Sequence, residues 1–175
     1  MLGKMCGAFM FRRSFIRPFE ARDRPGMTAL YVAAWHATYD AIDGAAAIDR
    51  VIAALMDGPD PEMFALGHGD IALVAEMGGR LVGGVRGHPR ERELHLSGLY
   101  VAPDAQRRGV GAALLEHLTG RYPAGLAVRA DVRPTSMAAQ RFYGAQGFVE
   151  VGRGRADVGG GHWIDTIELR RESKR

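Results

Sequence analysis

The chain has 175 residues, of which 47% are hydrophobic and 25% are charged, and its formal net charge is +3. These values are typical of a soluble globular protein with one domain. Cys6 is the only cysteine, which excludes an intrachain disulfide and a thiolate metal cluster within one chain. No apolar stretch approaches the roughly 20 residues that span a bilayer, so a cytoplasmic protein outside the membrane is expected.

The positive balance comes almost entirely from arginine, because Lys4 and Lys174 are the only lysines. A basic balance can indicate either nucleic acid or an anionic cofactor as the partner. No long run of basic residues interleaved with aromatic residues appears in the sequence. Nucleic acid is therefore not the expected partner.

Hydrophobic periodicity and turn residues predict the elements in chain order. They are a strand at 14–18, helices at 27–42 and 47–56, strands at 70–77, 80–87 and 93–101, a helix at 110–122, a strand at 126–132, a helix from 134–136 to 146, and strands at 148–152 and 163–170. Residues 88–92 are predicted as a polar loop. This order indicates an α+β or mixed α/β domain over 14–171. A disordered extension at 1–13 and a charged tail at 172–175 are expected.

A short loop, Gln106-Arg107-Arg108-Gly109-Val110-Gly111, lies between a predicted strand and the first turn of a predicted helix. The first N–H groups of a helix have no internal partner, and the helix dipole adds partial positive charge there. Glycines at 109 and 111 allow the backbone to approach a ligand closely. The two arginines can add charge-assisted hydrogen bonds to phosphate oxygens. The loop therefore predicts a pyrophosphate site.

Two other phosphate-binding loops fit this segment poorly. A P-loop requires Gly-Lys followed by Ser or Thr, which is absent. A dinucleotide-binding fingerprint requires a third glycine near Leu114 and a parallel βαβ unit, whereas the strand here follows a meander.

Two motifs in register resemble the GNAT superfamily of N-acyltransferases. The first is Gln-x-x-Gly-x-Gly at 106–111, which follows a Leu-Tyr-Val-x-Pro strand end at 99–103. The second runs from Ser136 to Phe148 and resembles Asn-x-x-Ala-x-x-Phe-Tyr-x-x-x-Gly-Phe, with Ser136 in place of the usual asparagine. Together with the element order, the resemblance covers about residues 14–171. It implies a single domain with a mixed, mostly antiparallel, twisted sheet of six or seven strands and about four helices.

The resemblance also implies that acetyl-CoA is the cosubstrate and that no metal is needed. The backbone of Leu99, Tyr100 and Val101 would pair with the pantetheine arm, and that of Val101 would polarise the thioester carbonyl. Ser136 could bond a pantetheine amide or cap its helix. The residues expected at the pyrophosphate are Gln106, Arg107, Arg108, Gly109, Val110, Gly111 and Ala112.

Three residues are candidates for proton transfer. By resemblance, Tyr143 protonates the departing thiolate, since a phenol can donate a proton at neutral pH, and its neighbour Phe142 is expected in the core beside the cofactor. The amine must lose a proton before it attacks, and His95 lies where some family members carry a base. By strand alternation His95 and Leu99 would share one face unless a bulge intervenes. Glu93, on the same expected face, is the second candidate base.

The acceptor is expected near the first two helices, where Trp35, His36, Tyr39 and Asp40 occur and where Asp40 or Asp43 could pair with an ammonium group. Trp35 and Tyr39, at i and i+4, are also typical of core packing. The sequence leaves the acceptor open among a small metabolite, an antibiotic, and a peptide α-amine or lysine.

The expected reaction is transfer of an acetyl group to a primary amine by direct attack in a ternary complex. A catalytically silent acyl-CoA-binding regulatory module and an enzyme that acetylates aminoacyl-tRNA are the alternatives. Many relatives pair through their late strands, so a homodimer is a further expectation to test.

Overall fold

A seven-stranded sheet and four α-helices form the molecule over the residues that the computed structural model describes, 14–56, 66–157 and 163–172. The predicted extension at 1–13 and the last three residues of the predicted charged tail lie outside the described residues. The strands are β1 (Phe15–Pro18), β2 (Ile71–Met77), β3 (Arg80–Arg90), β4 (Glu93–Val101), β5 (Ala127–Val132), β6 (Val149–Asp157) and β7 (Trp163–Arg171). The helices are α1 (Arg24–Asp43), α2 (Ala45–Leu55), α3 (Val110–Thr119) and α4 (Met137–Ala145).

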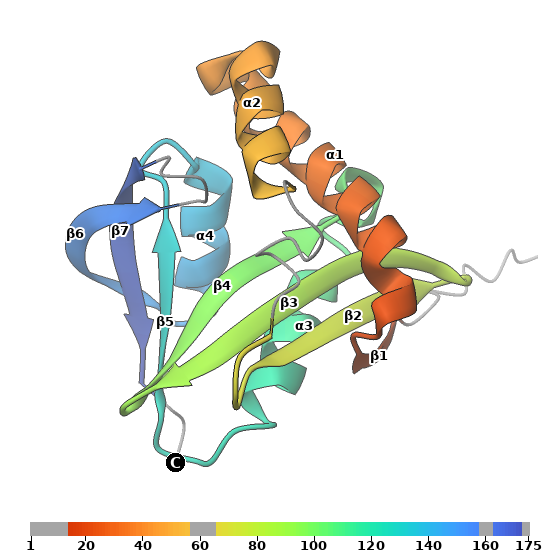
Figure 1. Ribbon diagram of the computed structural model, residues 1–175. Helices are drawn as coiled ribbons and strands as arrows, with labels where there is room; N and C mark the ends of the chain where they lie inside the picture. The colour runs from red at the N-terminus through yellow and green to blue at the C-terminus, as the bar shows by residue number, and fades with distance from the viewer. Residues whose placement is uncertain (1–13, 57–65, 158–162, 173–175) are drawn as a thin grey trace, which may run out of the picture.

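The strand order in the sheet is β1-β2-β3-β4-β5-β7-β6 (Figure 1). Every neighbouring pair is antiparallel except β4 and β5, which run parallel. The prediction of a mixed, mostly antiparallel sheet with about four helices is confirmed. In Figure 1 the two parallel strands start together and then diverge toward their carboxyl ends.

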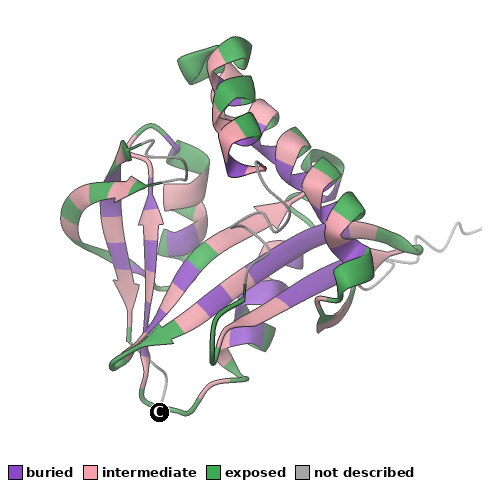
Figure 2. Cartoon of the chain, viewed as in Figure 1, coloured by how far each residue is buried: buried purple, intermediate pink, exposed green. Residues whose placement is uncertain are grey.

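Helices cover both faces of the β2–β4 region. A Cβ atom added at Gly83 or Gly87 would meet Leu114 or Leu118 of α3, so these positions of β3 face α3. A Cβ at Gly84 would meet Met27 of α1, which therefore lies on the opposite face. Strand alternation explains this division, because neighbouring residues point to opposite faces. The middle of β2 and of β3 is accordingly buried (Figure 2).

One predicted loop is a strand. Residues 88–90 continue β3, with His88 opposite His95 and Arg90 opposite Glu93. The prediction of a polar loop over 88–92 is correct for the turn at 91–92 and wrong for 88–90, because this end of the β3–β4 hairpin tolerates polar residues on both strands. β6 likewise runs five residues beyond its predicted end at 152, to Asp157. The predicted helix at 110–122 ends earlier, at Thr119.

Candidate functional site

A cleft opens in the sheet where β4 leaves β5. The two strands pair over Glu93–Leu96 and Ala127–Ala130, and β4 then continues to Val101 without β5 beside it. At the same point the β3–β4 register slips, since Arg86 lies opposite Gly98 but Gly87 lies opposite Leu96. Ser97 is therefore the extra residue of a β-bulge, and a bulge bends and twists its strand. The bulge contributes to the divergence of the two strands.

The bulge also changes which side chains share a face. Tyr100 packs against Tyr31 of α1, and His95 contacts His88 on the α1 face of β3. Leu99 instead lies near Gly111 of α3, on the opposite face. The expectation that His95 and Leu99 share one face was wrong, because Ser97 adds one residue to the alternation.

Peptide groups of β4 line the cleft. The Ala102 N–H donates to the Val82 oxygen of β3 at 2.9 Å, so by alternation the peptide groups of Leu99 and Val101 point away from β3. On that side β5 has already diverged. The Val101 oxygen accepts a hydrogen bond of 3.2 Å from the Gln106 side chain, which ties the strand end to the next loop. The peptide groups of Leu99 and the N–H of Val101 are thus available to an extended ligand within the cleft.

The loop between β4 and α3 has the form expected of an anion site. Gly109 precedes α3 with φ of 81°, and a Cβ added there would meet nothing within 4 Å. Arg107 also has positive φ, at 57°, which is uncommon for a residue with a side chain. Arg107 and Arg108 are exposed, and neither forms an ion pair with another described residue. The first turn of α3 therefore presents N–H donors and positive charge to an open space.

Gly111 serves packing between helices. A Cβ at this position would lie 3.2 Å from Phe142 of α4 and 3.4 Å from Leu99 of β4. These distances are at or below ordinary van der Waals contact, so the missing side chain allows α3 to approach both elements. Phe142 is half-buried there, beside the loop and next to Tyr143. The predicted cofactor residues at 99–101, 106–112 and 142 thus surround one end of the cleft.

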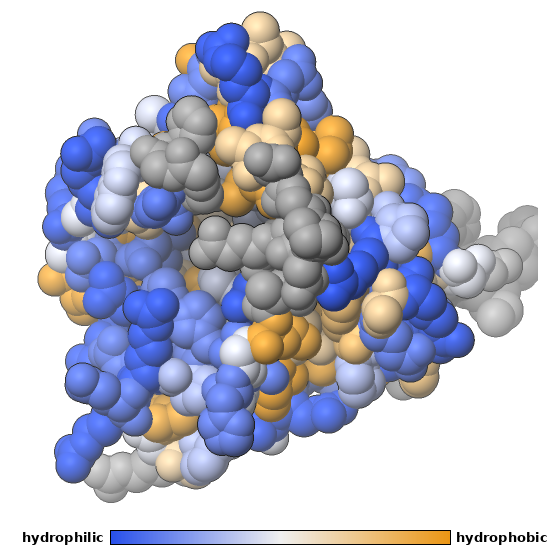
Figure 3. Space-filling model, viewed as in Figure 1, coloured by the Kyte–Doolittle hydropathy of each residue, from blue (hydrophilic) through white to orange (hydrophobic). Residues whose placement is uncertain are grey.

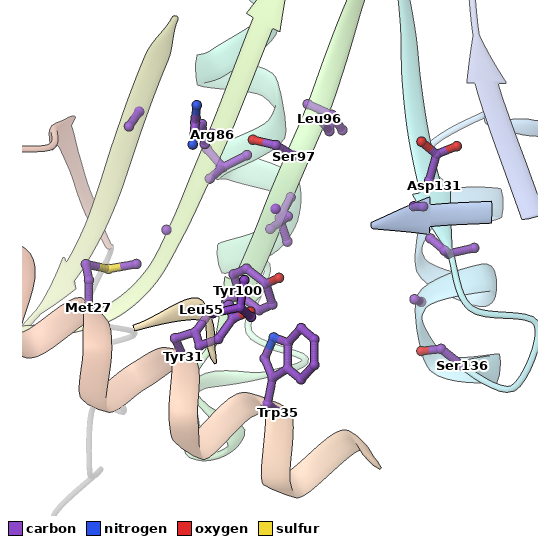
Figure 4. A pocket seen from close by; sticks show the side chains of 18 of the residues that line it. Met27, Tyr31, Trp35, Leu55, Arg86, Leu96, Ser97, Tyr100, Asp131 and Ser136 are labelled. Carbon is purple, nitrogen blue, oxygen red and sulfur yellow. The ribbon is translucent and has the colours of Figure 1, made fainter. Parts of the chain in front are cut away.

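A cavity of about 380 Å³ occupies the cleft and extends toward α1. Its lining includes Ser97–Tyr100 of β4, Asp131–Arg133 at the end of β5, and Ser136 and Tyr143 at α4. Figure 4 shows Tyr31, Trp35 and Tyr100 on one side of it, and Asp131 and Ser136 on the other. The cavity therefore joins the predicted donor residues to the helix expected to meet the acceptor.

Tyr143 is buried against aromatic rings. Its ring centroid lies 5.1 Å from that of Phe142 and 5.0 Å from that of Phe148. Burial, with smaller contributions from Tyr100 and Tyr39, raises the pKa of the Tyr143 phenol above its ordinary value. The hydroxyl therefore keeps its proton at neutral pH.

His95 belongs to a chain of hydrogen bonds that ends at the cavity. Its Nε2 lies 2.8 Å from Asp131 Oδ2, and its Nδ1 lies 3.1 Å from His88 Nε2. Burial alone would raise the pKa of the Asp131 carboxyl, but the His95 hydrogen bond and the charges of His95 and Arg129 outweigh it and lower that pKa. Burial and His95 lower the pKa of His88. Asp131, which lines the cavity, is thus held as a carboxylate.

Sequence reasoning did not identify Asp131 or His88. The β4–β5 pairing brings Asp131 to His95 from far along the chain, and no local motif marks that contact. Glu93 occupies a different setting from His95. It lies at the start of β4, away from the cleft, in a 3.0 Å ion pair with Arg170.

The residues expected at the acceptor divide into two groups. Trp35 and Tyr39 line the cavity. Trp35 is also buried in a cluster with Tyr31, so it both packs in the core and lines the cavity. His36 instead bonds Asp40 at 2.8 Å, outside the cavity lining.

Two contacts link the end of α1 to the start of α4. Asp43 binds Arg133, with 3.0 Å between Oδ1 and Nη2, and the guanidinium lies over the Tyr39 ring. Ser136 occupies the N-cap position of α4, but its hydroxyl makes no capping hydrogen bond.

Comparisons with known proteins agree with this geometry. The family model described as "Acetyltransferase (GNAT) family" matches residues 35–148 of this chain. A solved GCN5-related N-acetyltransferase from Rhodopseudomonas palustris is 26% identical, with a TM-score of 0.71 over 91% of this chain and 95% of that one. PaiA N-acetyltransferase from Thermoplasma acidophilum, solved with coenzyme A, is 17% identical, with a TM-score of 0.70 over 91% and 99%.

The ribosomal-protein-S18-alanine N-acetyltransferase from Escherichia coli is 22% identical, with a TM-score of 0.62 over 93% of this chain and 96% of that one. No curated protein sequence matched the chain. Among the helices of the described ranges, none is both long and apolar enough to cross a membrane. The family match spans more than half of the chain, and the sheet, the cleft and the loop before α3 agree with it. The chain therefore belongs to the GNAT family of acetyltransferases, enzymes that transfer acyl groups.

Proposed function

We propose that the enzyme transfers an acetyl group from acetyl-CoA to a primary amine by direct attack within a ternary complex. The observation that carries this proposal is the cleft between β4 and β5, which has an anion-binding loop at one end and a cavity with Tyr143 and Asp131 at the other. Two substrates bound from opposite ends would meet inside the sheet. Proximity of this kind accounts for a large part of the catalysis of bimolecular reactions.

The residues of the donor end fit coenzyme A. Residues 106–112 would hold the pyrophosphate through the N–H groups of the first turn of α3 and the exposed arginines. The open space beside Gly109 leaves room for the phosphates. The peptide groups of Leu99 and Val101 would hydrogen-bond the pantetheine arm, and the buried Ser136 hydroxyl lies near its path along α4. Acetyl-CoA supplies the activated acyl group, and Val101 N–H would stabilise charge on its carbonyl oxygen.

Tyr143 is the proposed general acid. Tyr143 lines the cavity, and its buried phenol is protonated at neutral pH. We expect Tyr143→Phe to lower kcat by about a hundredfold, which is within the usual contribution of general acid catalysis, while coenzyme A affinity stays within about twofold. Free-thiol release and a direct binding titration with acetyl-CoA measure the two quantities.

Tyr122→Phe is the matched control for that substitution. The Tyr122 hydroxyl bonds the Gly87 oxygen at 2.7 Å, away from the cavity lining, so its loss should not change kcat. No binding of acetyl-CoA to the wild-type enzyme would contradict the whole proposal. Binding without transfer to any amine would instead favour a silent acyl-CoA-binding module.

His95 is the proposed general base, with Asp131 as the residue that orients its ring and stabilises its charged form. Because both ring nitrogens of His95 already bond Asp131 and His88, and Asp131 lines the cavity, the amine proton would enter this hydrogen-bonded chain at the Asp131 carboxylate. We assign Glu93 to the ion pair with Arg170 and not to catalysis.

Paired substitutions test the choice of base. His95→Gln should lower kcat by about a hundredfold, whereas Glu93→Gln should change it by less than threefold. Initial rates at saturating substrates measure both. The reverse order of effects would transfer the base role to Glu93. A cytoplasmic location and a homodimer stay predictions, to be checked by cell fractionation and by light scattering.

A further inference from the structure

The two walls of the cavity differ in chemistry. One wall, from α1, α2 and β4, is lined mainly by apolar and aromatic side chains, with Ser97 and the neighbouring Arg86 of β3 on the same side (Figure 4): Met27, Tyr31, Trp35, Leu55 and Tyr100. The other, from β5 to β7, presents the polar groups Asp131, Asp157 and Thr166. In Figure 4 the labelled aromatic rings and Asp131 lie on opposite sides of the gap between β4 and β5. In Figure 3 the side of the molecule over β5–β7 is mostly hydrophilic, with hydrophobic atoms nearer the centre.

The aromatic wall is packed and carries no charge. The Tyr31 ring centroid lies 5.2 Å from that of Trp35 and 4.8 Å from that of Tyr100. Burial raises the pKa of Tyr31, and it raises that of Tyr100 to about 12, so both phenols stay neutral. A flat or branched apolar group placed against these rings would be desolvated on one side by rings already held in position.

The positive groups of the cavity are already paired. Arg86 binds Asp70 at 2.9 Å, and Arg133 binds Asp43. Among the described lining residues, both arginines are therefore already paired with carboxylates of the protein, with which a substrate carboxylate would have to compete. Asp131 lines the cavity as a carboxylate, 2.8 Å from His95 Nε2 and 3.4 Å from Arg129, and its remaining lone pairs can accept hydrogen bonds from an ammonium group. The polar wall is thus suited to an ammonium group and unsuited to an anion.

We propose that the acceptor is a small primary amine carried on an aromatic or bulky apolar group, with no acidic group beside the amine. Asp131 binds the ammonium form, and the apolar group packs on Tyr31, Trp35 and Tyr100. This proposal rests on the proposed acetyl transfer, because it describes the acceptor half of the same cavity. A volume of about 380 Å³ accommodates the acylated end of the cofactor together with an amine of about ten non-hydrogen atoms.

An amine series on the wild-type enzyme tests the proposal. With acetyl-CoA fixed, kcat/KM is measured for 2-phenylethylamine, for ethylamine, which lacks the ring, and for phenylalanine, which adds a carboxylate. We expect 2-phenylethylamine to exceed ethylamine by about thirtyfold, the effect of burying one aromatic group. It should exceed phenylalanine by at least about tenfold, because the added carboxylate meets Asp131 and finds no partner. Ethylamine or phenylalanine equal to or better than 2-phenylethylamine would overturn the proposal.

A binding measurement separates this proposal from the chemistry. Trp35 and Trp163 are the only tryptophans, and Trp163 is exposed outside the cavity lining. Trp163→Phe therefore makes Trp35 the only tryptophan. Its emission should change saturably with 2-phenylethylamine in the presence of coenzyme A, but not with phenylalanine. Selective binding of 2-phenylethylamine without any transfer would contradict the proposed function and support the acceptor class. Transfer without discrimination among the amines would support the proposed function and contradict the acceptor class.

Two variants divide the contributions of the walls. Asp131→Asn should lower kcat/KM for both 2-phenylethylamine and ethylamine by about tenfold and leave their ratio unchanged, because both lose the charged hydrogen bond. Trp35→Leu should reduce the ratio by about threefold or more. Phe15→Leu, an exposed change on the edge strand β1, is the control that alters neither. A ratio unchanged by Trp35→Leu in a folded variant would place the apolar group elsewhere.

Discussion

The sheet has two halves that are stabilised in different ways. In the β1–β4 half, α1 and α3 cover both faces, and the central strands are buried (Figure 2). In the β5–β7 half, β6 alternates between exposed and half-buried residues, and ion pairs such as Arg129 with Glu168 at 3.1 Å lie on the face away from α4. Apolar burial fixes the first half, whereas the second has one packed face and one polar face. The cleft forms where these two halves separate.

The largest expected effect removes a core side chain from the β1–β4 half. Leu114 of α3 is fully buried, so Leu114→Ala should lower the free energy of unfolding by about 3 to 4 kcal/mol through lost transfer energy and a cavity. Val151→Ala, on exposed β6, should change it by less than about 0.5 kcal/mol. Urea unfolding measures both. Equal losses would show that β6 is covered in solution, as in a dimer.

The next effect compares a buried ion pair with an exposed one. Asp23 is 5% exposed and binds Arg17 through two hydrogen bonds of 2.7 Å, whereas Glu150 and Arg153 of β6 are largely in solvent. Asp23→Asn should lower the free energy of unfolding by about 2 kcal/mol at pH 7, and Glu150→Gln by less than about 0.5 kcal/mol.

The pH dependence of that comparison has a defined sign. Hydrogen bonding to Arg17 is the main cause that lowers the pKa of Asp23. A lowered folded-state pKa means that the carboxylate stabilises the fold above its unfolded pKa of about 3.9 and loses this contribution as pH falls through the folded value. The difference between wild type and Asp23→Asn should therefore shrink below about pH 4. A difference that stays constant to low pH would contradict the ion-pair explanation.

The smallest effect concerns the junction of the halves. The His95–Asp131 hydrogen bond joins β4 to β5 beside their last paired residues. Asp131→Asn should cost about 1 kcal/mol of unfolding free energy at pH 7. Because the pKa of Asp131 is also lowered, this loss should diminish as pH falls below about 4. Thermal unfolding across that pH range measures this loss of unfolding free energy. An Asp131→Asn variant as stable as the wild type at pH 7 would mean that only backbone pairing stabilises the contact between β4 and β5.

Local patterns predicted the parts of the site whose residues are consecutive. The loop at 106–111 and the segment from Ser136 to Phe148 carry their own turn and helix signals, so they were placed on the correct elements. The element order followed from hydrophobic periodicity, and the mixed, mostly antiparallel sheet followed from the resemblance to the GNAT superfamily.

Contacts between distant residues could not be predicted in this way. The bulge at Ser97 leaves no mark in the pattern, yet it places His95 and Leu99 on opposite faces. Asp131 reaches His95 only through a parallel strand pairing. The polar end of β3 resembled a loop because exposed strand ends and loops share the same residue types. Each of these errors arose where tertiary contacts decide between alternatives that are locally equivalent.

The contact of Gly111 with Phe142 has a consequence for how such enzymes diverge. A methyl group at position 111 would lie 3.2 Å from the Phe142 ring, and the next residue of α4 is Tyr143. A larger residue at 111 would therefore displace the helix that carries the proposed acid. In relatives with this helix arrangement, positions 111 and 142 should covary, with a side chain at 111 accompanied by a smaller residue at 142. Selection for donor binding by the loop at 106–111 and selection for the position of Tyr143 would then act on the same pair of residues, 111 and 142.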